Sequence, residues 1–254
     1  MLTAITRAVS TSINQCELTN LVRIPIDMER ATTQHQEYEE TLKLLGVEVH
    51  SLPAEPDLPD AVFVEDVAIV LDECALLTRP GADSRRPEVE SVGLALAPYR
   101  KLFTIQAPGT MDGGDVLAIG KTIYVGLSGR SNQPAIDQMR TFLAPFGYSV
   151  RGVPVTGCLH LKSAVTQVSA DTLLVNPVWV DKSNFPGMKF IEVAPSEHYA
   201  ANALMVKETI IYQPAYPKTS LRLEEADIHP YLVDQSELAK AEGALTCCSL
   251  IFKI

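Results

Sequence analysis

Short apolar runs alternate with polar turns along most of the chain, and many of these runs come in pairs. Two strand-like segments joined by a polar turn are typical of a β-hairpin. Four such pairs are DVAIVLDECALLTR from Asp66, GDVLAIGKTIYVG from Gly114, KSAVTQVSADTLLV from Lys162 and ANALMVKETIIYQP from Ala201. The pattern predicts an imperfect repeat in which each unit opens with a hairpin.

The two ends of the chain carry the same kind of run. Residues 2–9 (LTAITRAV) and 247–254 (CCSLIFKI) are both short and apolar. An apolar terminus of this kind is rarely a loose tail. We expect the two ends to pair as a fifth hairpin, with Cys247 at the start of the closing strand. This pairing would close a ring of strands and remove exposed sheet edges.

Segments with helical spacing follow some of the hairpins. Residues 29–45 and 133–146 each carry apolar residues on one face, and each ends before a glycine, Gly46 or Gly147. The unit is therefore strand, strand, helix, strand. We predict an α/β fold, a five-unit α/β propeller closed by pairing of the N- and C-terminal strands. A mixed α/β protein with chance hairpins is the alternative. No linker divides the chain, so we expect one domain over residues 1–254.

Composition restricts the partners. The 254 residues carry a formal net charge of −10 without an acidic or basic block, which argues against nucleic acid and against an anionic membrane surface. A cationic small molecule is favoured. No apolar run reaches the length of a membrane span, and the first residues lack the pattern of a signal peptide. We expect a cytoplasmic protein, and a homodimer is compatible with the sequence.

The cysteines indicate free thiols. There are five, an odd number, and they are scattered in a chain too large to need disulfides. Cys158, His160, Cys247 and Cys248 offer the thiolate and imidazole groups that zinc prefers, but the paired spacing of structural zinc sites is absent. We expect no structural metal.

Polar residues without an obvious structural task recur at one position of the repeat, just before or at the start of its first strand. They are Glu65, Asp66, Asp112, His160, Tyr199, Asn202 and Cys247. In a closed ring these positions face one another, which predicts a carboxylate-rich funnel with one His and one Cys. Carboxylates suit a guanidinium, whose N–H groups form a fixed fork. A thiolate could then attack its central carbon while His160 protonates the leaving amine.

Each of these residues also has a structural interpretation. His160 between leucines could be a hydrogen-bonded core residue, and the acidic pair could be a solvated loop or cap. Gly113 and Gly114 could mark a tight turn or a close backbone approach. Cys247 and Cys248 could be inert buried thiols. Their common register with the repeat favours the functional interpretation.

Two loops carry arginines at similar points of successive units. Arg85 and Arg86 lie in TRPGADSRR, and Arg130 lies in GLSGRSN. They are either surface charges or a clamp for the α-carboxylate of an amino acid.

Six segments together resemble those of the dimethylarginine dimethylaminohydrolases, a family of the guanidino-group modifying (pentein) superfamily. They are LPDAVFVEDVAIV, TRPGADSRR, APGTMDGGDVL, GLSGRSNQ, LHLKSAV and ALTCCSLI, and the match spans nearly the whole chain. The resemblance implies the five-unit α/β propeller, no cofactor, and a small guanidino amino acid as substrate. The implied reaction converts asymmetric dimethylarginine and monomethylarginine to citrulline and dimethylamine or methylamine through a cysteine thiouronium.

The resemblance also implies roles for the residues at matching positions. Cys247 is the nucleophile, and Cys248 faces away because side chains alternate along a strand. His160 is the general acid and base, and Asp112 is its carboxylate neighbour, where some bacterial relatives have Glu. Asp66 binds the guanidinium.

The remaining carried-over residues lie around the rest of the substrate. Glu65 lies beside Asp66. Arg85 and Arg130 hold the α-carboxylate. Asp60 and the backbone carbonyls of Leu18 and Ala241 receive the α-amino group.

Three other functions are the alternatives. An arginine deiminase would act on unmethylated arginine, but the chain lacks the extra helical domain that such enzymes often carry. An amidinotransferase would pass the amidino group to an amine. A non-catalytic binding module is the alternative from another class, and the joint presence of Cys247, His160, Asp112 and Asp66 argues against it.

Overall fold

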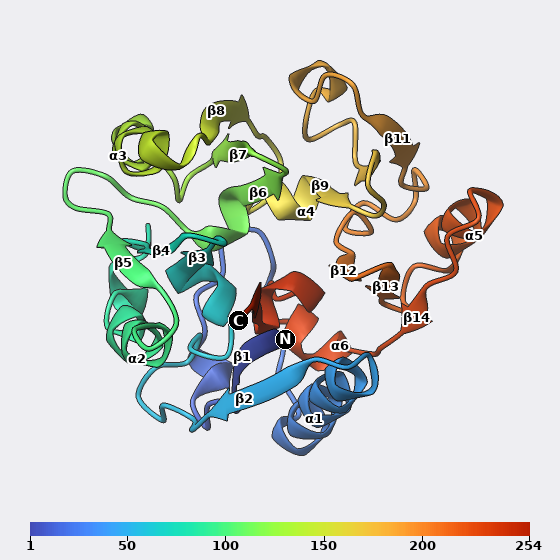
Figure 1. Cartoon of the computed structure of the whole chain (residues 1–254). Helices are drawn as coiled ribbons and strands as arrows, with labels where there is room; N and C mark the ends of the chain where they lie inside the picture. Colours follow the sequence, from blue (N-terminus) through green and yellow to red (C-terminus); the bar gives the residue numbers. More distant parts are fainter.

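The computed structural model describes residues 1–254 and contains five three-stranded sheets that follow one another around a common centre (Figure 1). The strands are β1 (Leu2–Arg7), β2 (Glu48–Leu52), β3 (Ala68–Val70), β4 (Cys74–Leu77), β5 (Lys101–Thr104), β6 (Val116–Ile119), β7 (Thr122–Leu127), β8 (Ser149–Pro154), β9 (Val165–Gln167), β10 (Thr172–Val175), β11 (Lys189–Glu192), β12 (Leu204–Val206), β13 (Thr209–Tyr212), β14 (Tyr231–Leu232) and β15 (Leu250–Lys253). Four sheets are consecutive triplets from β3–β5 to β12–β14, and the fifth has the order β15-β1-β2.

Every sheet repeats one connection pattern. Its first two strands are antiparallel and its third strand runs parallel to the second. The four internal hairpins predicted from the apolar pairs are confirmed as β3/β4, β6/β7, β9/β10 and β12/β13.

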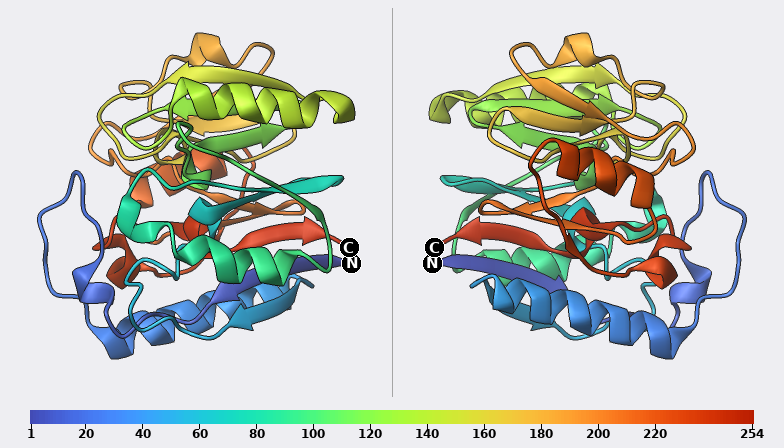
Figure 2. Two further views of the ribbon diagram at one scale, coloured as in Figure 1. Left: turned by 90° about the vertical axis from the view of Figure 1, so that its left-hand side faces the viewer. Right: turned by 90° about the vertical axis from the view of Figure 1, so that its right-hand side faces the viewer.

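The predicted pairing of the chain ends is also confirmed. Strands β1 and β15 are antiparallel, with Leu2 opposite Lys253. Beyond them, the Met1 ammonium donates to the Ile254 carbonyl at 2.9 Å, and the Ile254 N–H donates to the Met1 carbonyl at 2.9 Å. The two termini therefore lie side by side, as Figure 2 shows from both sides.

In four of the sheets, a helix connects the second strand to the third. The helices are α1 (Met28–Leu44), α2 (Glu88–Leu96), α3 (Gln133–Leu143), α4 (Leu161–Ala164), α5 (Pro217–Glu225) and α6 (Ser236–Ala239). Helices α1, α2, α3 and α5 make these connections, whereas β10 and β11 are joined through a short 3-10 turn, Lys182–Asn184. The helices predicted over 29–45 and 133–146 are confirmed, although residues 144–146 form a 3-10 turn. No helix is both long enough and apolar enough to cross a membrane.

The buried apolar residues form five clusters, and each cluster lies between two successive sheets. One of them packs β1 and β15 against β3 and β4, and another packs α3 and β6–β8 against the sheet before it. The largest contains Ala4 of β1 together with Val206 and Ile211 of the β12–β14 sheet. Since no sheet buries its apolar face alone, each depends on both neighbours. The last sheet packs against the first in the same way.

A helical turn precedes the first strand in four of the units. These turns are Val64–Val67, Gly113–Asp115, Leu161–Ala164 and Leu245–Cys248. The prediction that Cys247 begins the closing strand is therefore wrong, because β15 begins at Leu250. The Cys247 N–H donates to the Ala244 carbonyl at 3.1 Å, which closes a turn. A short apolar run does not distinguish such a turn from a buried strand.

Candidate active site

Two of the helical turns place Asp66 and Cys247 at one pocket of about 330 Å³, and His160, directly before a third turn, lines the same pocket. Seven of the ten residues predicted for the site line it: Asp60, Asp66, Arg85, Arg130, His160, Ala241 and Cys247. Asp112, Glu65 and Leu18 do not. The pocket therefore brings the predicted thiol, imidazole and guanidinium-binding carboxylate together.

Cys247 and Cys248 lie in different surroundings. The Cys247 thiol is 9 % exposed and lines the pocket, whereas Cys248 is fully buried, with its Sγ 3.8 Å from Gln235 Oε1. Strand alternation does not separate them, since both lie in a 3-10 turn, where successive side chains are rotated by about 120°. Burial, followed by the charges of Glu65 and Asp66, raises the pKa of Cys247. The thiol is therefore protonated in the empty pocket at neutral pH.

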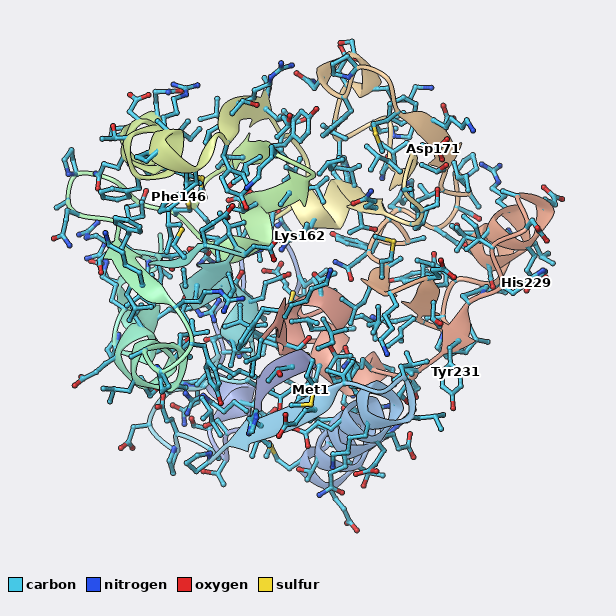
Figure 3. All side chains as sticks on the ribbon, in the orientation of Figure 1. Met1, Phe146, Lys162, Asp171, His229 and Tyr231 are labelled. Atoms are coloured by element: carbon cyan, nitrogen blue, oxygen red, sulfur yellow. The ribbon has the colours of Figure 1, made fainter.

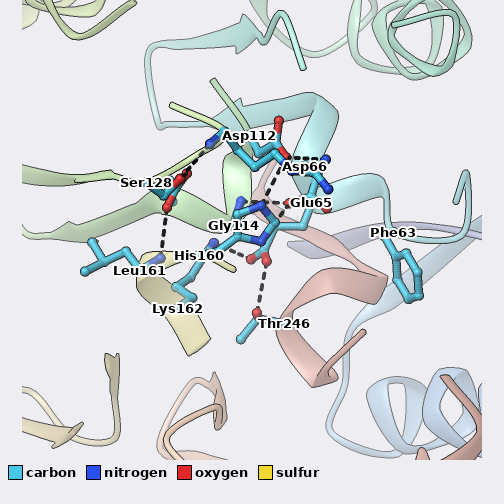
Figure 4. A network of polar contacts seen from close by, with 12 residues as sticks. Phe63, Glu65, Asp66, Asp112, Gly114, Ser128, His160, Leu161, Lys162 and Thr246 are labelled. Atoms are coloured by element: carbon cyan, nitrogen blue, oxygen red, sulfur yellow. Dashed lines mark hydrogen bonds and ion pairs between the residues drawn. The ribbon is translucent and has the colours of Figure 1, made fainter. Parts of the chain in front are cut away.

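His160 lies between two carboxylates. Its Nε2 is 3.0 Å from Asp112 Oδ2, and its Nδ1 is 3.9 Å from Asp66 Oδ1 (Figure 4). Burial opposes the charged ring, but the negative charge of Asp66 and the hydrogen bond with Asp112 raise the pKa of His160 to about 9. His160 therefore carries a positive charge at neutral pH.

Asp112 is buried directly behind His160 and orients it. Besides the imidazole, this carboxylate accepts the backbone N–H of Gly81 at 2.8 Å. A second carboxylate, Asp115, accepts the hydroxyls of Ser128 and Ser131 at 2.6 Å and the N–H of Leu161 at 2.9 Å. Asp115 thus fixes the turn that follows His160. Sequence reasoning missed it, although it is the last residue of MDGGD.

The neighbouring carboxylates of Glu65 and Asp66 lie in different environments. Asp66 accepts the N–H of Gly114 at 2.9 Å and an N–H of Arg85 at 2.6 Å. Burial opposes its ionisation, but His160 and Arg85 hold its pKa well below the usual range. Glu65 is paired instead with Lys162 and accepts the Thr246 hydroxyl at 2.9 Å. Burial, partly opposed by Lys162, raises the pKa of Glu65.

Glu65 therefore lies behind the pocket. It lines a separate cavity of about 870 Å³ together with Lys162 and Thr246. The side-chain view in Figure 3 labels Lys162 near the centre around which the sheets are arranged. Glu65 therefore does not face the pocket that contains Cys247 and His160.

Gly113 and Gly114 allow a close backbone approach. A Cβ on Gly113 would lie 1.9 Å from the Glu65 carbonyl oxygen, and one on Gly114 would lie 2.5 Å from His160 Nδ1 and 2.8 Å from Asp66 Oδ1. Any side chain at Gly114 would push apart the imidazole and the carboxylate.

The two predicted arginines are not surface charges. Arg85 is 4 % exposed, and its guanidinium is paired with Asp66 at 2.6 Å and Glu88 at 2.8 Å. Arg130 donates to the Thr19 hydroxyl at 3.0 Å and lies 3.7 Å from Asp112 Oδ2, and its side chain is 13 % exposed. Arg85 therefore holds the carboxylates of the site in place, and Arg130 has more freedom to meet a ligand.

One end of the pocket is covered by a loop near the N-terminus. Glu17, rather than Leu18, lines the pocket, and the Glu17 N–H donates to Asp60 at 3.0 Å. Leu18 packs on the apolar cluster beneath. The Glu242 carboxylate accepts the N–H groups of residues 19, 20 and 21 at 2.8, 2.5 and 2.8 Å. Sequence reasoning missed Glu17 and Glu242, because nothing local shows that residues 17–21 meet residue 242.

Two residues predicted for the funnel lie elsewhere. Tyr199 is 42 % exposed and packs against Trp179, with ring centroids 5.0 Å apart. Asn202 donates to the Lys162 carbonyl at 3.1 Å and to the Thr246 hydroxyl at 3.0 Å. Asn202 is thus a structural link between two units.

One group of side chains has metal-ligand geometry. The ligand atoms of Asp66, Asp112 and His160 lie within 4.8 Å of one another. The four zinc ligands considered from the sequence do not converge in this way. The Nε2 atom of His160 already has a hydrogen-bond partner, Asp112. It is therefore not free to bind a metal ion.

Comparisons with known proteins show the family of the chain. The sequence model of the family "N,N dimethylarginine dimethylhydrolase, eukaryotic" matches residues 7–181. An N(G),N(G)-dimethylarginine dimethylaminohydrolase of Streptomyces coelicolor is 39 % identical over 97 % of this chain and 95 % of its own, and one of Pseudomonas aeruginosa is 35 % identical over 89 % and 90 %. A solved structure of a variant of the P. aeruginosa enzyme with citrulline has a TM-score of 0.94, 33 % identity and 98 % coverage of both chains.

More distant structures share the fold alone. The N-terminal domain of ArgZ, a cyanobacterial arginine dihydrolase, has a TM-score of 0.88 at 20 % identity and covers 99 % of this chain. The fold and the set of groups in the pocket define a hydrolase of the pentein class, which acts on C–N bonds. Within that class, the chain belongs to the dimethylarginine dimethylaminohydrolase family.

Proposed function

We propose that the protein hydrolyses asymmetric dimethylarginine and monomethylarginine to citrulline and dimethylamine or methylamine. The observation that carries this function is the convergence of Cys247, His160 and Asp66 on one buried pocket in a member of this family. A thiol, a charged imidazole and an ionised carboxylate are the groups that a covalent attack on a guanidinium requires.

Substrate binding uses the charges of the pocket. The Asp66 carboxylate accepts N–H groups of the guanidinium, as charge-assisted bonds favour. Arg130 leaves Thr19 for the α-carboxylate, supported by Arg85. The Asp60 carboxylate and the Ala241 carbonyl receive the α-amino group, and the Leu18 carbonyl reaches it when the loop adjusts.

The bound cation activates the thiol. In the empty pocket, burial and two carboxylates keep Cys247 protonated. A guanidinium adds a positive charge beside the sulfur and favours the thiolate, because a nearby cation stabilises the anion. The thiol proton passes to solvent, and the thiolate then attacks the central carbon.

His160 serves first as the acid and then as the base. Its pKa of about 9 keeps it protonated at neutral pH. When the C–N bond breaks, its electron pair stays on the methylated nitrogen, which takes the His160 proton. The neutral imidazole next removes a proton from water. The resulting hydroxide adds to the thiouronium carbon and the C–S bond breaks. The added O–H group gives its proton to the departing thiolate, and citrulline and the Cys247 thiol are released.

The test is a side-by-side assay of the purified protein on arginine, monomethylarginine and asymmetric dimethylarginine, with citrulline and alkylamine both measured. We expect a preference for the methylated substrates in kcat/KM. One methyl group in a matched space gives about 10- to 200-fold discrimination. Faster release of ammonia from arginine than of alkylamine from the methylarginines would identify an arginine deiminase instead.

The raised pKa of Cys247 predicts slow alkylation of the empty enzyme. Iodoacetamide reacts with the thiolate, so the rate of inactivation should still increase with pH at pH 9. Mass spectrometry should locate the modification at Cys247. A rate that is already constant below pH 8 would show that the thiol is ionised without substrate.

We further infer that the five sheets are the blades of one α/β propeller and that residues 1–254 form one domain. The apolar clusters between all successive sheets support this arrangement. The cytoplasmic location and the homodimer stay predictions.

A further inference from the structure

A second pocket of about 660 Å³ borders the catalytic one. The two share Leu159, Glu242 and Gly243 as common walls. Leu159 directly precedes His160, the residue that protonates the leaving nitrogen. We call this second space the side chamber.

The side chamber contains polar groups without partners. Gln213 is 4 % exposed, and its side-chain amide has no hydrogen-bond partner within the protein. The hydroxyls of Tyr199 and Tyr216, which also line the chamber, are likewise unpaired. The Gln213 amide is not sealed off from solvent, because its atoms are accessible from the chamber. It is therefore free to bind a polar ligand that enters the chamber.

The charge in the chamber favours a small organic cation. No lysine or arginine lines it, and its one carboxylate is Glu242. Neutral backbone N–H groups bind that carboxylate, so its charge is not cancelled. Burial, followed by the charge of Glu242, raises the pKa of Tyr199, so the carboxylate acts on the chamber. Tyrosine rings add a further attraction for cations.

The proposed reaction requires a second space of this kind. After the C–N bond breaks, the amino-acid part stays bound to Cys247 and fills the catalytic pocket. The amine must leave, and water must arrive, while that pocket is still occupied. An alkylamine resembles the lysine side chain, whose usual pKa is about 10.4, so it becomes an ammonium ion once released.

We infer that the side chamber receives the alkylammonium ion on its way out of the catalytic pocket. This inference rests on the proposed function and adds an exit site to it. Gln213 accepts an N–H of the ion, Glu242 supplies the opposite charge, and Tyr199 and Tyr216 contact its methyl groups.

The experiment is a titration of the Cys247→Ser variant with dimethylammonium chloride, in saturating citrulline and at constant ionic strength. Citrulline fills the catalytic pocket, as the amino-acid part does after amine loss. Trp179, the only tryptophan of the chain, packs on Tyr199 and reports binding by its fluorescence. Sodium chloride and 2-propanol, a neutral molecule of similar shape, are the controls.

We expect a saturable change with dimethylammonium and none with either control. Adding Gln213→Leu should weaken binding about 10- to 100-fold, since a hydrogen bond to a charged group is worth about 1.5 to 3 kcal/mol and 1.4 kcal/mol is a factor of ten. Adding Gln213→Glu, of nearly the same size, should strengthen binding at pH 8. Circular dichroism verifies that both variants are folded.

Two results would overturn the inference: equal binding by the Leu, Glu and Gln forms, or complete loss of binding when citrulline is present. The second result would place the cation in the catalytic pocket. A wild-type protein that releases no alkylamine from methylarginines would overturn the proposed function itself. Normal turnover without saturable binding would remove only the exit site.

Discussion

Replacing Cys247 with serine removes turnover of methylarginines, with an expected loss in kcat of roughly 10⁴-fold or more, as for other enzymes that lose their nucleophile. A serine hydroxyl is far less acidic than a thiol, so the bound guanidinium cannot generate the attacking anion. The measurement is citrulline formation at saturating monomethylarginine, with substrate affinity determined separately by calorimetry. Affinity should be largely retained, because Asp66 and Asp60 remain.

Cys248→Ser is the matched control for this experiment. Its side chain contacts Gln235 outside the pocket. We expect the variant to keep most of its kcat and to lose some stability, since a hydroxyl replaces a buried thiol. If Cys248→Ser instead lost turnover and Cys247→Ser kept it, the nucleophile would be Cys248.

Replacing His160 with alanine should lower kcat by about 10²- to 10⁴-fold, the usual contribution of a general acid–base group. The leaving amine then lacks its proton donor, and water lacks its base. The fall in kcat should be larger for the methylarginine whose amine is the poorer leaving group. Steady-state rates on both methylarginines measure the effect.

His35→Ala is the control for removing a buried histidine. His35 lies in α1, is 3 % exposed and does not line the pocket. The His35→Ala substitution should lower the free energy of unfolding, because it removes a buried side chain. It should leave kcat within about 2-fold, because His35 has no role in the pocket. Near-normal turnover by the His160→Ala variant would show that His160 is a buried structural histidine and not the general acid and base.

The repeat could be predicted from the sequence, because the spacing of hydrophobic residues and the identity of turn residues are both local signals. The hairpins, the two amphipathic helices and the pairing of the chain ends all follow from them. The shared register also placed Asp66, His160 and Cys247 together. The helical turns that hold these side chains were not predictable, since an apolar run of four residues fits a turn and a strand equally well.

The support around the site depends on contacts between distant segments, which no local pattern records. Asp115 reaches Leu161 and Glu242 reaches residues 19–21 only because the ring brings those segments together. Arg85 was expected at the surface or on the substrate, yet it pairs with Glu88 three residues later. The sequence shows the charges, but the fold decides which are already paired.

The paired termini determine how the molecule responds to a pulling force. Strands β1 and β15 are antiparallel and end at the same edge, with Leu2 opposite Lys253. A force applied at Met1 and Ile254 loads the bonds between these strands one after another, as in opening a zipper, instead of shearing all of them at once. This seam should therefore separate at a low force. The turn that carries Cys247 lies one residue before β15, so stretching the ends would reach the proposed nucleophile soon after β15 separates.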